Sequence, residues 1–170
     1  MKSEESHKHI LKINLYPNDV LRYAIPETDL NQDLEWEKIS DLMHNTMESA
    51  DGLGLAANQV SVGVRMFVMR ERRTFINPKI INVSDKQVLI EEGCLSFPNL
   101  FMKVSRPEWV EIEWFDEKLN KSVDRFTNIW AQCIQHEIDH LDGKLFIDRV
   151  SKLKYEKAKN KQSKINDQSR

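Results

Sequence analysis

Two stretches of the chain carry apolar residues at helical spacing. The first predicts a helix that begins at an Asp33 cap and runs to about Ala50, because apolar side chains recur there every three or four residues. His44 falls outside the apolar face of this helix. The side chains expected on the inner face are Leu34, Ile39, Leu42, Met43, Thr46 and Met47.

The second helical stretch carries two histidines on its apolar stripe. The members of the stripe follow one another at intervals of four, three and four residues, as Ile129, Cys133, His136 and His140. Both histidines are therefore expected to face the core. Thr127 or Asn128 can cap the start of this helix, and Gly143 can end it in a left-handed conformation.

Shorter stretches carry β-strand patterns. The candidate strands cover residues 64–69, 76–83, 88–92 and 110–114, and a turn near 116–118 leads to a further strand around Val123. Strands around one central helix, with another helix toward the N-terminus, predict an α+β fold with small mixed or antiparallel sheets. The length suits one domain, which we assign to residues 1–150, followed by a tail at 151–170.

Residues 136–140 read His-Glu-Ile-Asp-His. On a helix, His136 and His140 lie one turn apart on one face, so both imidazoles can bind one ion while Glu137 points toward a ligand on that ion. A pair of hydrogen-bonded core histidines is the alternative without a metal. A water-activating site normally takes three protein ligands and keeps one position open, so a third ligand is required.

The third ligand separates the candidate classes of metalloprotein. Metzincin proteases use a histidine six residues after the second one, but that position holds Phe146. Thermolysin-like proteases use a downstream glutamate, and the only glutamate after His140 is Glu156, in a lysine-rich tail. Cys94 is the better ligand, because the glycine before it and the Ser-Phe-Pro after it interrupt a strand pattern and leave the thiol at a strand end. A buried apolar cysteine, or a disulfide with Cys133, is the alternative interpretation.

Residues 52–59 form a third motif, Gly-Leu-Gly-Leu-Ala-Ala-Asn-Gln. Its small residues suit a loop whose backbone approaches a substrate or another strand closely, although a tight structural turn has the same pattern. Gln59 carries a primary amide that can donate a hydrogen bond to a developing oxyanion.

With these three motifs the chain resembles the peptide deformylases, which remove the formyl group from the N-terminal methionine of new polypeptides. Members of that family carry a Gly-x-Gly-x-Ala-Ala-x-Gln segment, a Glu-Gly-Cys-Leu-Ser segment and a His-Glu-x-x-His helix, in this order. The chain has all three, at 52–59, 92–96 and 136–140. A zinc endopeptidase and a non-catalytic metal-binding protein are the competing functions.

The resemblance implies a metal-dependent hydrolase whose ligands are Cys94, His136 and His140 and whose general acid and base is Glu137. It further implies one divalent ion, Fe2+ in the cell, with Zn2+, Ni2+ or Co2+ able to occupy the site. N-formylmethionyl nascent polypeptides are the implied partners.

Further roles follow from the same resemblance. The tetrahedral oxyanion would be held by the metal, the Gln59 amide and the Leu95 backbone N–H. Substrate binding would fall to four residues around the methionine pocket, namely Leu53, Gly54, Glu92 and Gly93.

Three positions depart from the usual pattern of the family. Asn58 stands where many members have Pro or Thr. Phe101 stands where many bacterial members have an arginine lining the substrate groove, and Gln132 where an apolar residue is common. The last two bear on the side chains that the substrate prefers.

Charge is unevenly distributed along the chain. Residues 151–170 carry seven lysines or arginines against two acids, a net charge of +5, which leaves −7 for residues 1–150 given the total of −2. This tail is either a solvated terminus or an arm that contacts ribosomal RNA. The polar N-terminus and the lack of a long apolar segment predict a cytoplasmic protein, bacterial or phage-encoded, that binds neither membrane nor specific DNA.

Overall fold

A computed structural model describes residues 9–168, so the ends of the predicted domain and tail, at 1–8 and 169–170, lie outside the described residues. The helices are α1 (Trp36–Ser49), α2 (Asn128–Leu141) and α3 (Lys152–Gln168). The strands are β1 (Gly54–Ala56), β2 (Met66–Met69), β3 (Arg73–Val83), β4 (Gln87–Cys94), β5 (Phe97–Pro107), β6 (Trp109–Phe115) and β7 (Lys121–Thr127). Short 3-10 helices are η1 (Asp19–Arg22), η2 (Ala57–Val60) and η3 (Phe146–Arg149).

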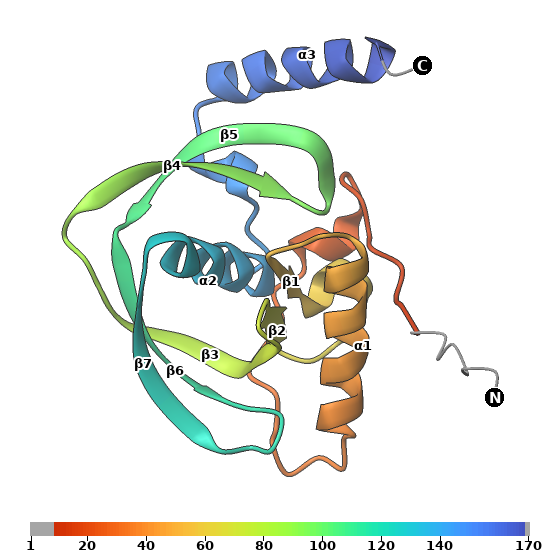
Figure 1. The fold of residues 1–170 in the computed structure, drawn as a ribbon, viewed down its shortest axis with the longest axis vertical. Helices are drawn as coiled ribbons and strands as arrows, with labels where there is room; N and C mark the ends of the chain where they lie inside the picture. The colour runs from red at the N-terminus through yellow and green to blue at the C-terminus, as the bar shows by residue number, and fades with distance from the viewer. Residues whose placement is uncertain (1–8, 169–170) are drawn as a thin grey trace, which may run out of the picture.

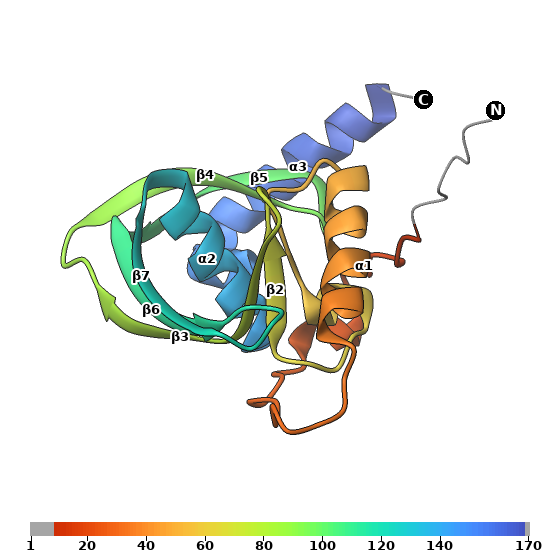
Figure 2. The same cartoon turned by 60° about the horizontal axis from the view of Figure 1, so that its bottom comes forward.

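The strands form two antiparallel sheets. One has five strands in the order β1-β2-β3-β6-β7, and the other is the β4-β5 hairpin. The larger sheet curves around α2, and the hairpin covers the opposite side of that helix (Figure 1). Seen from below, α1 lies outside this arrangement against β2 (Figure 2). The predicted α+β fold with a central helix is confirmed.

The central helix α2 is enclosed along most of its length. Every residue from Ala131 to Leu141 is buried, so the predicted inward orientation of both histidines is confirmed. Ile129, predicted on the same inner stripe, is instead 46% exposed, because burial of α2 begins only after its first turn. Gly143 follows the helix with a φ of +69°, as predicted. Thr127 occupies the N-cap position, without a capping bond from its side chain.

Helix α1 begins later than the sequence pattern predicts. Glu35, not Asp33, is the N-cap residue, because the backbone N–H of Leu34 donates to the Gln32 carbonyl at 2.9 Å in a turn that precedes the helix. His44 is also more buried than its place outside the apolar face implies. It is 1% exposed, and its Nε2 lies 3.2 Å from Oγ1 of Thr74 on β3.

The β-strand predictions match β2, β3, β4, β6 and β7 to within a few residues. Strands β1 and β5 were not predicted. Strand β5 includes Pro98, which reads as a strand breaker in the sequence but is accommodated near the start of a strand that pairs on one side only. None of the helices within residues 9–168 is both long and apolar enough to cross a membrane.

Candidate metal centre and active site

One thiol and two imidazoles meet between β4 and α2. Cys94 is the last residue of β4, and its Sγ lies 3.2 Å from Nε2 of His140. The ligand atoms of Cys94, His136 and His140 all lie within 4.8 Å of one another. A thiolate with two imidazoles is a donor set for zinc, iron, nickel or cobalt, and three ligands leave one position for a reactant. These residues therefore fit one divalent ion.

A buried charge network fixes the orientation of one of these ligands. Nδ1 of His136 lies 3.0 Å from Oε2 of Glu92, which leaves Nε2 of the ring free to act as the ligand atom. Glu92 accepts two hydrogen bonds from the guanidinium of Arg106, and Nη1 of Arg106 reaches Oδ2 of Asp139 at 2.9 Å. Burial alone would raise the pKa of Glu92, but the hydrogen bonds from Arg106 and His136 lower it to about 2. Glu92 is therefore ionised at any working pH.

His140 is held through its backbone. The side-chain amide of Asn58 donates to the His140 carbonyl near the end of α2. Burial lowers the pKa of His140 well below its usual value, so the ring stays neutral, as a metal ligand must be. Within the described residues, Nδ1 of His140 is buried without a hydrogen-bond partner.

Glu137 has a buried carboxylate beside the ligand cluster. It is 4% exposed, and its Oε2 has no hydrogen-bond partner among the described residues. Burial raises the pKa of Glu137 to about 7, which suits a group that must both accept and donate a proton near neutral pH. A Cβ at Gly54 would lie 2.6 Å from Oε1 of Glu137 and 2.7 Å from Sγ of Cys133. The backbone of the glycine motif thus lies close to the Glu137 carboxylate at Gly54.

The orientation of the Gln59 amide is set by its neighbours. Oε1 accepts a hydrogen bond from the Ala56 N–H at 2.8 Å, so Nε2 must point the other way. It lies 3.1 Å from Oγ of Ser96 and 3.5 Å from Sγ of Cys94. Leu95 follows Cys94 in the turn between β4 and β5 and lines the same cavity.

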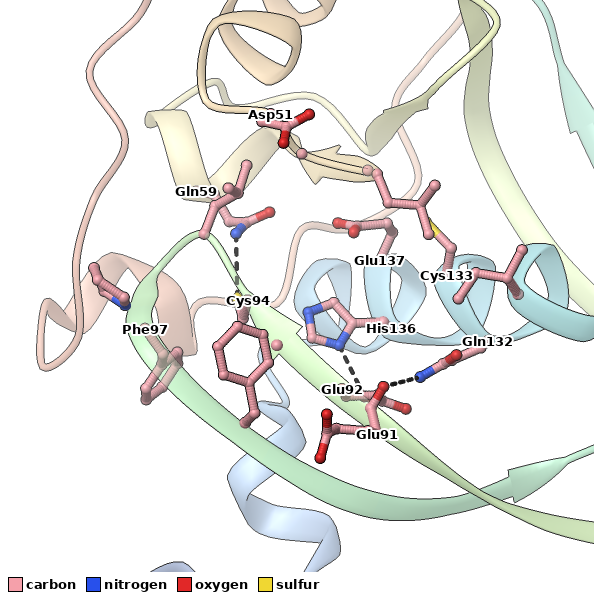
Figure 3. A pocket seen from close by; sticks show the side chains of 18 of the residues that line it. Asp51, Gln59, Glu91, Glu92, Cys94, Phe97, Gln132, Cys133, His136 and Glu137 are labelled. Atoms are coloured by element: carbon pink, nitrogen blue, oxygen red, sulfur yellow. Dashed lines mark hydrogen bonds and ion pairs between the residues drawn. The ribbon is translucent and has the colours of Figure 1, made fainter. Parts of the chain in front are cut away.

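A cavity of about 500 Å³ opens onto these groups. Figure 3 shows His136 and Glu137 pointing into it from α2, with Gln59 and Cys94 on the other side. Leu53, Gly54, Glu92 and Gly93, the predicted substrate-binding residues, all line the cavity, although the Glu92 carboxylate turns toward His136 and Arg106. Both cysteines are free thiols, so the disulfide interpretation is wrong.

Sequence reasoning missed two residues that support the site, Arg106 and Asn58. Arg106 is 0% exposed at an inward position of β5, where its neighbours in the alternation are Met102 and Val104. A lone arginine on the apolar face of a strand was the available signal, since a charge is rarely buried without a partner. The contact from Asn58 had no such signal, because it reaches a backbone carbonyl 82 residues away in the chain.

Comparison with known proteins agrees with this geometry. Residues 10–156 match the family model described as Polypeptide deformylase. The peptide deformylase of Psychrobacter cryohalolentis is 39% identical over 163 residues, covering 92% of this chain and 88% of that protein.

Two solved structures show the same likeness. A peptide deformylase from Synechococcus elongatus in complex with actinonin superposes with a TM-score of 0.84 at 36% identity, covering 90% of this chain and 88% of the other. A Met-Ala-Ser-bound peptide deformylase from Acinetobacter baumannii has a TM-score of 0.79 at 28% identity, covering 84% and 99% of the two chains.

Proposed function

The chain belongs to the polypeptide deformylase family and is a metal-dependent hydrolase that removes the formyl group from N-terminal methionine, and on this premise we propose the role of each residue in the reaction. In this proposal residues 1–150 form the catalytic domain and residues 151–170 a basic C-terminal tail. The observation that carries the assignment is the buried carboxylate of Glu137 beside the Cys94, His136 and His140 cluster, whose Oε2 has no hydrogen-bond partner among the described residues.

Cys94, His136 and His140 would hold the ion. A bound divalent cation supplies Lewis-acid chemistry, which acidifies a water and polarises a carbonyl oxygen. Glu92 would keep the His136 ring in the orientation that ligation requires, through the hydrogen bond to Nδ1.

Glu137 would act as the general base and then as the general acid. Its carboxylate would take a proton from the attacking water and return that proton to the nitrogen of the departing methionine amine. Formate and a peptide with a free N-terminus are the products. A pKa of about 7 suits both halves of this cycle.

Gln59 and Leu95 would stabilise the oxyanion that forms on the formyl oxygen when water adds to the formyl carbon. The Gln59 amide is oriented by Ala56 so that Nε2 faces the thiol, where a donor to the oxyanion is required. The Leu95 N–H would donate from the turn after Cys94.

The cavity would take the methionine side chain between α2 and β4. Its predicted contacts are Leu53, Gly54, Glu92 and Gly93, which lie on its wall. The peptide Met-Ala-Ser is bound in the Acinetobacter baumannii enzyme, and it is the product expected from formyl-Met-Ala-Ser. Formyl-Met-Ala-Ser is therefore the substrate of choice for a first assay.

Formate release by the nickel-loaded protein under anaerobic conditions tests this proposal. The parent should release formate from formyl-Met-Ala-Ser, and Glu137→Gln should lower kcat/KM by roughly 10²- to 10⁴-fold while binding the same amount of nickel. A Glu137→Gln variant as active as the parent would remove Glu137 from the mechanism. No release from a folded, nickel-loaded parent, combined with cleavage of internal peptide bonds, would instead favour the endopeptidase.

We propose Fe2+ as the ion that the protein holds in the cell. Iron(II) binds such sites less tightly than zinc or nickel, so cellular supply and the thiolate would set the occupancy. An iron-bound thiolate is readily oxidised, and the iron form should lose activity in air through oxidation of Cys94 or the metal. Full activity after prolonged exposure to air would contradict this expectation.

We also propose that α3 contacts the ribosome in the cytoplasm of a bacterium or of a phage-infected cell. The helix packs on β5 through Tyr155 and Ala158, and it exposes basic side chains to solvent, namely Lys152, Lys157, Lys159 and Lys161. Exposed lysines attract RNA phosphates in a salt-dependent manner. Co-sedimentation with ribosomes should weaken at high salt and on changing these four lysines to glutamine, and absent or salt-insensitive binding would reject the contact.

A further inference from the structure

A short segment before η1 crosses three parts of the molecule that surround the site. In Figure 1 this red segment passes α1 and the tip of the β4-β5 hairpin before it reaches η1. We call residues 11–16 the strap. Its backbone N–H groups donate to α1, to η2 and to the turn between β4 and β5, through the pairs Leu11 to Oγ1 of Thr46 at 2.8 Å, Asn14 to the Gln59 carbonyl at 2.7 Å and Tyr16 to the Ser96 carbonyl at 2.9 Å.

The carbonyl of Gln59 accepts two hydrogen bonds from one residue of the strap, Asn14. The backbone N–H donates at 2.7 Å and the side-chain Nδ2 donates at 3.0 Å. The same Nδ2 also donates to Oγ of Ser61 at 2.9 Å. A carbonyl oxygen has two lone pairs, so both can be used by Asn14. We propose that Asn14 is a positioning residue that fixes the backbone of Gln59 so that its amide meets the oxyanion, a role that rests on the function of Gln59 proposed above.

The other contacts of Gln59 leave its backbone position undetermined. Oε1 accepts from the Ala56 N–H, and Nε2 donates to Oγ of Ser96, so these two contacts set the rotation of the amide. Gln59 lies in η2, a 3-10 helix of only four residues. So short a helix has few internal hydrogen bonds to fix its own place. The bonds from Asn14 therefore decide where the side chain of Gln59 starts.

The strap is also attached on the other side of the oxyanion site. Its Tyr16 N–H donates to Ser96, the residue after the second proposed donor, Leu95. The Tyr16 ring stacks on Phe97, with 4.7 Å between the ring centroids. Two residues of chain span at most about 7 Å, so the attachments at Asn14 and Tyr16 limit how far the segments of the two donors can separate.

A positioning role differs measurably from a purely structural one. An oxyanion donor acts in the transition state and not on the bound substrate, so a displaced Gln59 amide should lower kcat and leave KM nearly unchanged. A strap that only stabilises the fold would instead lower the free energy of unfolding, with no change in the kcat of the folded protein.

Asn14→Asp tests the proposal with a side chain of the same shape. It replaces the Nδ2 donor by a carboxylate oxygen that repels the Gln59 carbonyl. With formyl-Met-Ala-Ser and the nickel-loaded protein, kcat should fall by roughly tenfold, a fraction of the roughly 100- to 1,000-fold cost of losing an oxyanion donor. KM and bound nickel should be unchanged.

Asn120→Asp is the matched control. Asn120 is exposed between β6 and β7, does not line the cavity, and donates from Nδ2 to Oδ2 of Asp116 at 3.0 Å. The same substitution there also sets a carboxylate against an acceptor, and it should leave kcat unchanged.

A double-mutant cycle shows whether Asn14 acts through Gln59. In a Gln59→Ala background, Asn14→Asp should lower kcat no further, because the amide that Asn14 positions is absent. Asn14→Ala removes the Nδ2 bonds without adding a charge. It should show the same pattern with a smaller fall, and it replaces Asn14→Asp in the cycle if that variant does not fold.

Two results would overturn the inference while leaving the deformylase function in place. They are an unchanged kcat in the folded Asn14 variant, with Gln59→Ala impaired, and an equal fall in kcat with and without the Gln59 amide. A Gln59→Ala protein as active as the parent would overturn the oxyanion role of Gln59 and the inference with it. Absence of formate release from the folded, nickel-loaded parent would overturn the deformylase function itself.

Discussion

Nδ1 of His136 donates a hydrogen bond to the carboxylate of Glu92, with 3.0 Å between Nδ1 and Oε2. This contact decides which ring nitrogen is left for the metal. Because Arg106 donates to both oxygens of the same carboxylate, the imidazole is anchored to a charge that is itself held in place. The family motif Glu-Gly-Cys therefore supplies one ligand, Cys94. It also supplies Glu92, which orients a second ligand, His136.

Replacing Glu92 by glutamine should weaken metal binding. The amide can still accept the His136 hydrogen bond, but it carries no charge to strengthen the ligand and it loses its ion pair with Arg106. We expect metal affinity to fall by roughly 10- to 100-fold, measured by competition with a chelator. Glu91→Gln is the control, because Glu91 is exposed and forms no ion pair with His136 among the described residues. Equal affinities of the two variants would show that the contact does not tune the site.

Replacing Arg106 by methionine should destabilise the fold. Arg106 is fully buried and pairs with Glu92 and Asp139, so its loss leaves the buried carboxylate of Glu92 without its arginine partner, while Asp139 keeps Arg149. We expect the free energy of unfolding to fall by roughly 3–5 kcal/mol in urea denaturation. Arg72→Met is the matched control, because Arg72 also bridges two carboxylates but is 46% exposed, and its loss should cost under about 1 kcal/mol. An equal fall in the free energy of unfolding in the two variants would mean that burial does not determine how much this network stabilises the fold.

Replacing Gly54 by alanine should impair catalysis more than folding. The added methyl group would meet Oε1 of Glu137 at 2.6 Å and Sγ of Cys133 at 2.7 Å, so the carboxylate must move. A shift of about 1 Å in a catalytic group can cost roughly 100-fold in rate, and we expect a fall of that order in kcat/KM with bound nickel retained. Gly63→Ala adds the same methyl group where no atom lies within 4 Å, and it should leave the rate unchanged. A fully active Gly54→Ala protein would show that the carboxylate tolerates displacement.

The sequence predicted the parts of this molecule whose signals are local. Helical spacing was sufficient to predict that His136 and His140 face inward. The interrupted strand pattern was sufficient to predict that Cys94 lies at the end of a strand, which is β4. A local turn and tertiary contacts decided the rest. Asp33 has a side chain that suits an N-cap, but it lies in the turn that precedes α1. Arg106 is buried on β5 because carboxylates from β4 and α2 surround it. Nothing within five residues of Arg106 encodes these carboxylates.

His44 provides a prediction on pH. Burial, with a smaller contribution from Arg72, lowers its pKa to about 4, although Glu48 and Asp41 oppose the shift. In the unfolded chain the same imidazole titrates near pH 6.5. Between these two values the unfolded state binds more protons, so the contribution of neutral His44 to stability is complete above about pH 6.5 and is lost as the pH falls toward 4.

Replacing His44 by glutamine should flatten this dependence, because an amide can keep the hydrogen bond to Thr74 but does not titrate. The free energy of unfolding of the parent should fall more steeply than that of the variant between pH 7 and 4.5, by up to about 1.4 kcal/mol per pH unit. Urea denaturation of chelator-treated protein measures the difference without interference from the loss of metal at low pH. The metal ligands titrate alike in both proteins, so the difference reports His44. Parallel pH profiles would mean that the folded protein protonates His44 as readily as the unfolded chain does.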